Sequence, residues 1–439
     1  MGAKAAEGGG AALGNMDTRQ VPKDEKDYVI RVHQDPCELD ASEWNHLLQA
    51  QAAPTPFMRL EYLQAMQQSA SAVPETGWSA RFFSLRLGGV LQAACALYLK
   101  THSYGEYVFD WAWAHAYQQH GLRYYPKALV APPFSPVPGA RLLARDAQAR
   151  QALVRTLLAW CEREKLSSLH LLFCSPQDLA ACESAGLMLR HTVQFHWNNA
   201  SASADAGSGS GSGYQDFDAF LSTLSQEKRK KIRQERRKVR EAGVRFRVVQ
   251  GEAISQQDWD FFYACHERTY LEHGNAPYLS RDFFSRMAQT MPEHWLMFIA
   301  EAGEGAARRP IAASLIALGS EPASMLGPEP GSSPGQAVTK VAYGRYWGAL
   351  ERVDCLHFEA CYYQPIEWCI QQGYQRFEGG AQGEHKMARA LMPVRTSSAH
   401  WLAHPSFADA VQRFLEREGK GVEDYVEHLE QRSPFRRTA

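Results

Sequence analysis

The chain has 439 residues, of which 45% are hydrophobic and 22% are charged, and these fractions are typical of a soluble globular protein. This length exceeds the size at which one hydrophobic core usually stops growing, so we expect two domains. The formal net charge is −1, which excludes a global electrostatic attraction to nucleic acid or membrane and leaves only local charged patches.

The cysteines and the N-terminal residues predict a cytoplasmic protein. The 9 cysteines include no CxxC pair, a pattern typical of reduced thiols and not of a disulfide framework. Residues 1–27 are rich in Gly and Ala and lack the apolar segment of a secretory signal, so we expect a disordered tail. No run approaches the roughly 18 apolar residues of a transmembrane helix, so no membrane span is expected.

From residue 28 onward, the predicted elements occur twice in the same order. Residues 81–99 and 295–318 each read as a β-hairpin, because two β-rich runs flank a glycine-containing turn. Each hairpin is followed by a predicted aromatic strand, at 106–113 in the first half and at 341–349 in the second. The repetition indicates a duplicated unit.

A helix that leads into a strand then completes each half. The two segments LVRTLLAWCEREKLSSLHLLF and YYQPIEWCIQQGYQRFEGG carry a Trp-Cys pair at matching places. Alternating strands and helices predict an α/β architecture with mixed sheets, antiparallel through the hairpins and parallel where the helix crosses over. A parallel crossover places ligands at the carboxyl ends of strands.

The stretch ASASADAGSGSGSG, residues 200–213, predicts a flexible linker between the halves. We therefore expect an N-terminal unit over 28–199 and a C-terminal unit over 214–439. A second stretch rich in Gly, Pro and Ser, residues 319–336, is typical of an exposed loop, where added length costs little.

Residues 226–240, QEKRKKIRQERRKVR, predict a helix with nine cations and two acids. A solvated helix with Glu–Arg pairs is the ordinary explanation of such a run. The excess of cations also fits a phosphate-rich partner such as tRNA, CoA or a nucleotide-linked precursor, with Arg229 and Arg233 as candidate phosphate ligands. Few aromatic residues are interleaved for base stacking, which argues against sequence-specific DNA binding.

The segment RFEGGAQGEHKMAR, residues 376–389, joins a strand end to a group of ionisable residues. Gly379 and Gly380 allow positive φ and close approach to the backbone. Exposed N–H groups there, and at Gln382 and Gly383, would form a nest for a phosphate or a developing oxyanion.

The ionisable residues of this segment suggest roles in acid–base chemistry and phosphate binding. Lys386 and Arg389 would share a face of a helix that begins here, and both would hold phosphate. Glu384 or His385 would accept a proton from an amine or hydroxyl nucleophile. The alternative is an ordinary strand-to-helix turn with a solvated polar first turn.

LHFEACYYQ places His357 and Glu359 near a helix start, and both are candidate catalytic or substrate-binding residues. A purely electrostatic role at the helix N-terminus is the alternative for Glu359. Pro365 marks a late helix start or a kink. No zinc-site spacing links His357, His385 and Cys361, so no metal is expected.

Two further segments contribute a candidate acceptor cleft. GLRYYPKALVAPPFSP supplies Arg123, Tyr125 and Lys127 beside a proline-rich loop. In GRYWG, Arg345 and Tyr346 would point to opposite sides of a strand, so only one would face a pocket. No GxSxG, Walker A or HExxH motif is present, so the common hydrolase and NTPase classes lose support.

Several long motifs carry a family resemblance. They are FDWAWAHAYQQHGLRYYPKALVAPPFSPVPGARLL and QFHWNN in the first half, and LSQEKRKKIRQERRKV, GRYWG, LHFEACYYQ and GAQGEHKMAR in the second. Together they resemble a bacterial family of Fem-like proteins linked to peptidoglycan biosynthesis or recognition, within the GNAT-type acyl-CoA N-acyltransferase superfamily. The resemblance covers roughly residues 28–418.

The resemblance implies two GNAT-like units in tandem and transfer of an acyl or aminoacyl group to an amine, such as that of a peptidoglycan precursor. The donor would be acyl-CoA or aminoacyl-tRNA, used as a co-substrate without a permanent cofactor. QGEHK departs from the Q/R-x-x-G-x-G/A pyrophosphate fingerprint, which argues against acetyl-CoA, and Ala390 stands where the family favours Gly. A non-catalytic binder of cell-wall precursor or RNA that keeps the fold is the alternative.

Overall fold

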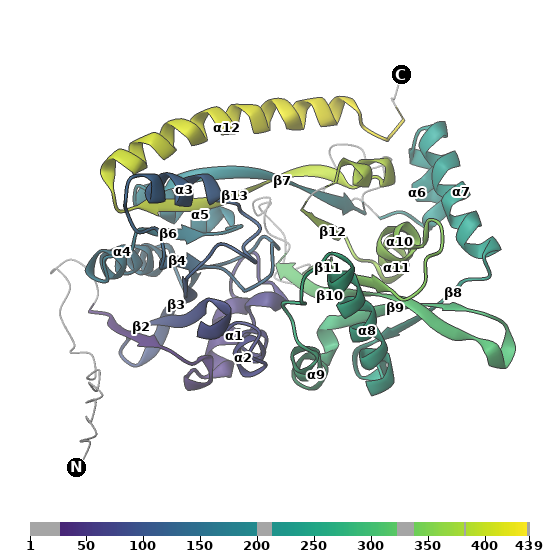
Figure 1. The fold of residues 1–439 in the computed structure, drawn as a ribbon, viewed down its shortest axis with the longest axis horizontal. Coiled ribbons are helices and arrows are strands. Elements are labelled where there is room, and N and C mark those ends of the chain that lie inside the picture. The colour runs from purple at the N-terminus through teal and green to yellow at the C-terminus, as the bar shows by residue number, and fades with distance from the viewer. Residues whose placement is uncertain (1–26, 200–212, 323–337, 382, 437–439) are drawn as a thin grey trace, which may run out of the picture.

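The computed structural model describes residues 27–199, 213–322, 338–381 and 383–436 (Figure 1). Most of the predicted tail 1–27, of the linker 200–213 and of the loop 319–336 therefore lies outside the described residues, as does Gln382. No helix in the described ranges is both long and apolar enough to cross a membrane.

One mixed sheet of 13 strands runs through the described chain. Its order is β1-β2-β3-β4-β6-β13-β7-β12-β11-β10-β9-β8, with β5 paired to β3. The strands are β1 (Val29–His33), β2 (Trp78–Leu87), β3 (Val90–Lys100), β4 (Lys127–Val130), β5 (Leu143–Ala144), β6 (Ser168–Leu171), β7 (Met188–Asn198), β8 (Arg245–Gln250), β9 (Trp295–Ala302), β10 (Arg309–Pro322), β11 (Val338–Ala349), β12 (Arg376–Ala381) and β13 (Met392–Leu402).

The strand order is the same when it is followed inward from either edge of the sheet. β1-β2-β3-β4-β6 correspond to β8-β9-β10-β11-β12, and in both series only the last pair is parallel. β13 and β7 pair with each other at the centre, and each also pairs with a strand of the other half. The tandem α/β units expected from the sequence are therefore confirmed, and they exchange their last strands.

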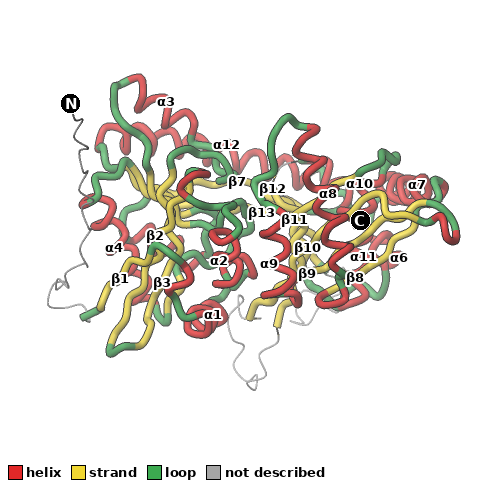
Figure 2. Tube along the Cα trace, turned by 60° about the horizontal axis from the view of Figure 1, so that its bottom comes forward, coloured by secondary structure: helices red, strands yellow, loops and turns green. Residues whose placement is uncertain are grey.

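Helices cover both faces of this sheet (Figures 1 and 2). On one face, four helices from both halves share one apolar core. They are α1 (Ala41–Gln49), α2 (Leu60–Gln68), α8 (Gln256–Glu272) and α9 (Arg281–Thr290). Tyr62 packs edge-on against Phe283 with ring centroids 5.4 Å apart, so the two halves are joined by a continuous hydrophobic core.

The opposite face has separate cores in the two halves. Alternate residues of each strand face opposite sides, so Phe82 enters the shared core and Phe83 enters the other. The remaining helices are α3 (Trp111–Gln119), α4 (Ala147–Arg163), α5 (Pro176–Ser184), α6 (Phe217–Thr223), α7 (Gln226–Glu241), α10 (Leu356–Phe358), α11 (Gln364–Gln372) and α12 (Pro405–Gln431). The long helix α12 lies along β7 and β13 and so spans the seam between the halves (Figure 1).

Both predicted hairpins are present, as β2–β3 and β9–β10, but the predicted strand over 106–113 is wrong. Those residues form a loop and the start of α3. The alternation of Trp111 and Trp113 suggested a strand, yet the carboxylate of Asp110 accepts hydrogen bonds from Tyr124 and Lys127, and these contacts hold the segment away from the sheet. In the sheet, β4 takes the place that corresponds to β11.

Candidate functional site

The parallel strands β11 and β12 pair over three residues only, Val341–Tyr343 with Arg376–Glu378, and then separate. Beyond the last pair lies a hollow of about 150 Å³, which we call the inter-strand pocket. It is lined by Ser314, Ile316, Gly344, Arg345, Tyr346, Trp347, His357, Cys361, Tyr362, Phe377 and Gly379. The carboxyl ends of parallel strands are the usual place for ligands in α/β sheets.

Arg345 and Tyr346 both line this pocket, which corrects the prediction that only one of them would do so. The register between β10 and β11 shifts here, so that Arg345 is the extra residue of a β-bulge. A bulge sets two successive residues against one partner and breaks the alternation of side chains. The guanidinium carbon of Arg345 lies 5.4 Å from the ring centroid of Tyr346.

Two glycines that line the pocket allow neighbouring side chains to pack closely against the backbone. A Cβ on Gly344 would lie 2.9 Å from the Phe377 ring, and a Cβ on Gly379 would lie 2.3 Å from the side chain of Leu391. Glycine is favoured at position 380 for another reason: its φ is 76°, a conformation that residues with a side chain rarely adopt. Gly383 also has a positive φ, of 100°, and begins the 3-10 helix Glu384–Arg389.

The wall opposite the strands comes from α10 and a π-helical turn, Glu359–Tyr363, that leads into α11. Pro365 follows this turn in the first turn of α11, which confirms the predicted change of helix geometry at this point. Ser314 on β10 donates a hydrogen bond to the carbonyl of Ala360 (2.7 Å) and holds the turn against the sheet. Cys361 and Tyr362 face the pocket from the turn.

His357 is exposed at the mouth of the pocket, which it lines. Desolvation lowers the pKa of His357 to about 4, and the nearby charges of His385, Arg389 and Lys386 add to the effect. The imidazole is therefore neutral at physiological pH. A neutral imidazole has one ring nitrogen that accepts a proton.

Lys386 is 5% exposed, and its Nζ donates to the carbonyl of Gly380 (3.2 Å). Burial lowers the pKa of Lys386 to about 8; the thiol of Cys361 opposes this effect and the cation of Arg345 adds to it. The ammonium of Lys386 therefore lies beside the pocket wall, close to Gly380.

Arg389 is buried and links the 3-10 helix to α7. Its Nη2 donates to both carboxylate oxygens of Glu235 (3.0 and 2.9 Å), and its Nη1 donates to the carbonyl of His385 (2.7 Å). The guanidinium also stacks 3.4 Å from the ring centroid of Phe358. These contacts hold the 3-10 helix in place, so the phosphate role predicted for Arg389 remains a prediction.

The two predicted proton acceptors of the 3-10 helix lie apart. The Nε2 atom of His385 is 3.3 Å from the hydroxyl of Tyr362, which brings His385 to the pocket rim. The side chain of Glu384 is 48% exposed and accepts hydrogen bonds from Tyr425 (3.0 Å) and Arg432 (3.3 Å) near the end of α12. Glu384 therefore faces α12, away from the pocket.

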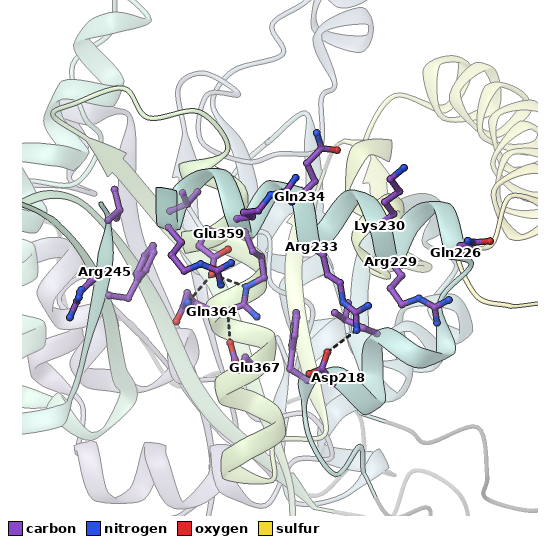
Figure 3. A pocket seen from close by; sticks show the side chains of 18 residues that line it. Asp218, Gln226, Arg229, Lys230, Arg233, Gln234, Arg245, Glu359, Gln364 and Glu367 are labelled. Carbon is purple, nitrogen blue, oxygen red and sulfur yellow. Dashed lines mark hydrogen bonds and ion pairs between the residues drawn. The ribbon is translucent and has the colours of Figure 1, made fainter. Parts of the chain in front are cut away.

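A larger open groove of about 1420 Å³ lies beside α7 (Figure 3). We call it the basic groove, because Arg229, Lys230, Arg233, Arg236, Arg237, Arg240 and Arg245 line it. Its acidic lining residues are Asp218, Glu359 and Glu367. The predicted helix over 226–240 is confirmed as α7.

Glu359 lies in the basic groove and not in the inter-strand pocket. Its Oε1 accepts hydrogen bonds from Arg236 (3.1 Å) and Gln364 (2.7 Å) (Figure 3). Its Oε2 is buried without a hydrogen-bond partner among the described residues. Burial raises the pKa of Glu359 even though Arg236 opposes the shift. One π-helical turn therefore separates the groove from the pocket.

The residues predicted to form an N-terminal acceptor cleft are not among those that line either hollow. Lys127 is fully buried, and its Nζ donates to Ser103 (2.8 Å), Glu106 (2.7 Å) and Asp110. Tyr125 lies next to this cluster, with its hydroxyl 2.8 Å from Ser103 Oγ, and Arg123 is exposed. These residues lie at the start of β4, whereas the corresponding pocket position is at its carboxyl end.

That carboxyl end is closed in the N-terminal half. The N–H of Leu172 donates to the carbonyl of Val130 (3.2 Å), which keeps the ends of β4 and β6 together. The fully buried Arg141 donates its Nε–H to the Leu172 carbonyl (2.7 Å) and occupies this position. The counterpart of the inter-strand pocket is therefore filled by side chains of the chain itself.

Four residues that line the pocket were not predicted from the sequence: Ser314, Gly344, Trp347 and Tyr362. Ser314, Trp347 and Tyr362 are ordinary core residues by pattern. The isolated Gly344 inside a predicted strand was a usable signal, because such a glycine often marks a bulge or a close approach of backbone.

The chain is thus a tandem α/β protein: its two units each contain a parallel pair of strands, they share one sheet, and the inter-strand pocket lies in the second unit. A family model for FemAB-like proteins, described as peptidoglycan biosynthesis/recognition, matches residues 36–437. The chain therefore belongs to the FemAB-like family, which confirms the resemblance found in its motifs.

Several solved structures are similar to this chain. The crystal structure of FemX is 9% identical, with 85% of this chain and 98% of that chain covered and a TM-score of 0.48. L-PGS from Bacillus licheniformis is 11% identical, with coverages of 87% and 98% and a TM-score of 0.48. A tandem GNAT protein from the clavulanic acid biosynthesis pathway is 11% identical, with coverages of 86% and 99% and a TM-score of 0.40. No curated protein sequence matches the chain significantly.

Proposed function

We propose that this protein transfers an acyl or aminoacyl group from a phosphate-bearing carrier to an amine in the cytoplasm, and that the inter-strand pocket holds the reacting centre. The main support is the separation of β11 and β12 after three residue pairs, which leaves bare backbone at Gly344 and Gly379 beside the neutral imidazole of His357. The amine of a peptidoglycan precursor is the acceptor that the family description favours.

In this reaction the amine attacks the acyl carbon, a C–N bond forms, and the C–S or C–O bond to the carrier breaks. His357 accepts the proton that the attacking amine loses and returns it to the departing thiolate or alkoxide. Backbone N–H groups near Gly380 and Gly383 stabilise the oxyanion of the tetrahedral intermediate. His385 lies at the rim beside the hydroxyl of Tyr362, and the ring of Tyr362 packs edge-on against that of His357 with centroids 5.7 Å apart.

The basic groove is the proposed site for the phosphates of the carrier, either CoA or tRNA. Arg229 and Arg233 line the groove, and the pair of Arg233 with Asp218 (3.0 Å) is exposed and therefore weak. Phosphate contacts make binding depend on salt. Each Arg→Gln change at these positions should weaken tRNA binding and lower the salt slope by about one, whereas a CoA carrier would show a raised KM for acyl-CoA.

The proposal is tested by mixing the protein with radiolabelled acyl-CoA or aminoacyl-tRNA and a panel of amine acceptors. We expect label transfer with one carrier, and a loss of roughly 10²-fold or more in His357→Gln, because a general base contributes on that scale. His115→Gln, an exposed histidine on α3, is the matched control. Binding of donor or precursor without transfer in any pairing would instead identify a non-catalytic binder, in line with the word recognition in the family description.

A further inference from the structure

Arg345 is a cation in the wall of the inter-strand pocket whose surroundings are phenols and not acids. Burial by itself lowers the pKa of Arg345, but the hydroxyls of Tyr346, Tyr107 and Tyr62 outweigh it and raise the pKa. Its Nε is buried and has no hydrogen-bond partner in the described part of the chain. Arg345 as a whole is half-buried, and a partly desolvated guanidinium is stabilised by an anion that reaches it.

Two other arginines of the same half, the half-buried Arg376 and the buried Arg389, have acidic partners within the chain. Arg376 contacts Glu378 at 2.9 Å, and Arg389 contacts Glu235 at 2.9 Å. Within the described ranges, no carboxylate lies within 4.0 Å of Arg345. Partly desolvated charges are commonly paired or bind a ligand, and Arg345 lines the pocket without an acidic partner, so it is the candidate ligand for an anion there.

The position of Arg345 is set by both halves of the molecule. Its Nη2 donates to the carbonyl of Phe134 (2.7 Å), in the proline-rich loop after β4. Phe134 has a φ of 54°, which non-glycine residues adopt rarely, and its ring stacks on Tyr278 with centroids 4.9 Å apart. Strained backbone of this kind is found where the surrounding structure holds a functional group in place.

We propose that Arg345 binds the carboxylate of the acceptor, so that the acceptor is an amino acid or peptide whose nucleophilic amine lies within a few bonds of a free carboxylate. This inference rests on the proposed function and names the substrate class of its site. A guanidinium recognises a carboxylate through paired N–H···O bonds, which a primary amide does not reproduce.

The size of the pocket supports an acceptor group of this kind. Arg345 and His357 line the same hollow of about 150 Å³, which has room for one small polar group and a few carbons. A carboxylate on Arg345 therefore leaves an amine attached a few bonds away within the same hollow as the imidazole of His357. An acceptor with a distant carboxylate, or with none, would leave the cation unpaired.

The test compares acids with their amides as probes of the full-length protein. L-Alanine and L-lysine are titrated against L-alaninamide and L-lysinamide by ligand-observed NMR, without any donor. We expect at least a tenfold preference for the acids, because hydrogen bonds between charged partners contribute more than neutral ones. Arg345→Met should abolish the preference and Arg345→Lys should restore part of it, while Arg413→Met on α12 should leave it unchanged.

The acid-to-amide comparison on the unchanged protein needs no variant, so a folding defect in Arg345→Met cannot mask the result. Equal binding of acids and amides, or a preference that survives in Arg345→Met, would overturn the carboxylate site. Acyl transfer to amides as efficient as transfer to acids would overturn it too, while leaving the acyltransferase proposal intact. Acid binding through Arg345 without transfer from any carrier would support the carboxylate site and contradict the proposed acyl transfer.

Discussion

His357 and Lys386 are basic side chains next to the inter-strand pocket, and desolvation by surrounding protein lowers the pKa of each, although His357 is exposed and Lys386 is buried. The pKa of His357 falls to about 4 and that of Lys386 to about 8. Desolvation disfavours the charged form of a base, and neighbouring cations act in the same direction. The pocket therefore combines a neutral imidazole with an ammonium that loses its proton readily, a pairing suited to proton transfer.

The lowered pKa of His357 makes folding stability depend on pH. The folded protein binds this proton more weakly than the unfolded chain, whose histidine has a pKa near 6.5. Stability contributed by the neutral ring is present above pH 6.5 and is lost as the pH falls toward 4. We expect His357→Gln to lose less stability than the parent protein across this window, measured by urea unfolding at several pH values.

The control for this measurement is His115→Gln, which should keep the parental pH dependence because the side chain is exposed on α3. Parallel curves for the parent protein and His357→Gln between pH 4 and 6.5 would show that the imidazole is not desolvated in the folded state.

At the scale of elements, β12 contains two adjacent glycines, Gly379 and Gly380, where its register with β7 shifts, and they are required for different reasons. Gly379 lacks room for a side chain, because its Cβ would lie 2.3 Å from the fully buried Leu391. Gly380 has room, since a Cβ there would meet nothing within 4 Å, but its φ is 76°. Alanine should thus act through packing at one position and through backbone strain at the other.

We predict that Gly379→Ala destabilises the protein by about 1 to 3 kcal/mol through overpacking and also weakens donor binding. Gly380→Ala should cost about 1 to 2 kcal/mol of backbone strain and leave the pocket open. Urea unfolding and binding of a labelled donor measure the two effects. Unchanged donor binding in Gly379→Ala would show that Gly379 does not contribute to the donor site.

The contact between the 3-10 helix Glu384–Arg389 and α7 is a buried ion pair. Removal of one partner leaves an uncompensated charge, so Arg389→Met should cost about 3 to 5 kcal/mol. The double variant Arg389→Met with Glu235→Met should recover most of this loss, because neither charge remains. Chemical unfolding of the two single variants and the double variant gives the coupling energy. Additive losses would mean that the two side chains do not interact.

At the scale of the whole molecule, the exchange of central strands joins the two halves. β13 from the C-terminal half lies between β6 and β7 of the N-terminal half. A fragment that ends at residue 199 would lack β12 and β13, so β6 would have an unpaired edge and β7 would lose both of its neighbours. The shared core of α1, α2, α8 and α9 adds an apolar interface between the halves.

We therefore predict that the full chain unfolds in one cooperative transition and that the fragment 27–199 does not fold alone. Far-UV and near-UV circular dichroism should report the same midpoint for the full chain, and the fragment should lack a near-UV spectrum. Two separated transitions, or a native-like fragment, would show that the halves are independent domains. The predicted linker at residues 200–213 would then separate two domains that unfold independently.

The amino-acid sequence by itself determined the features that depend on neighbouring residues. The hairpins, the basic helix α7 and the crossover helix α11 all follow from patterns within short segments, and long motifs sufficed to indicate the family. The turn expected at Gly379 and Gly380 is wrong, because both residues belong to β12. The false strand over 106–113 shows the limit of such patterns, because distant contacts of Asp110 decided that conformation.

Only the tertiary structure decided which residues meet. The bulge at Arg345 places both Arg345 and Tyr346 at one pocket. Glu384 is hydrogen-bonded to α12 and therefore lies apart from its neighbour His385. Arg141 fills the N-terminal counterpart of the pocket. β7 pairs with β12 of the C-terminal half, and β13 pairs with β6 of the N-terminal half. Each outcome depends on packing between segments far apart in the chain. A local sequence pattern is compatible with several such packings, so it does not specify which one forms.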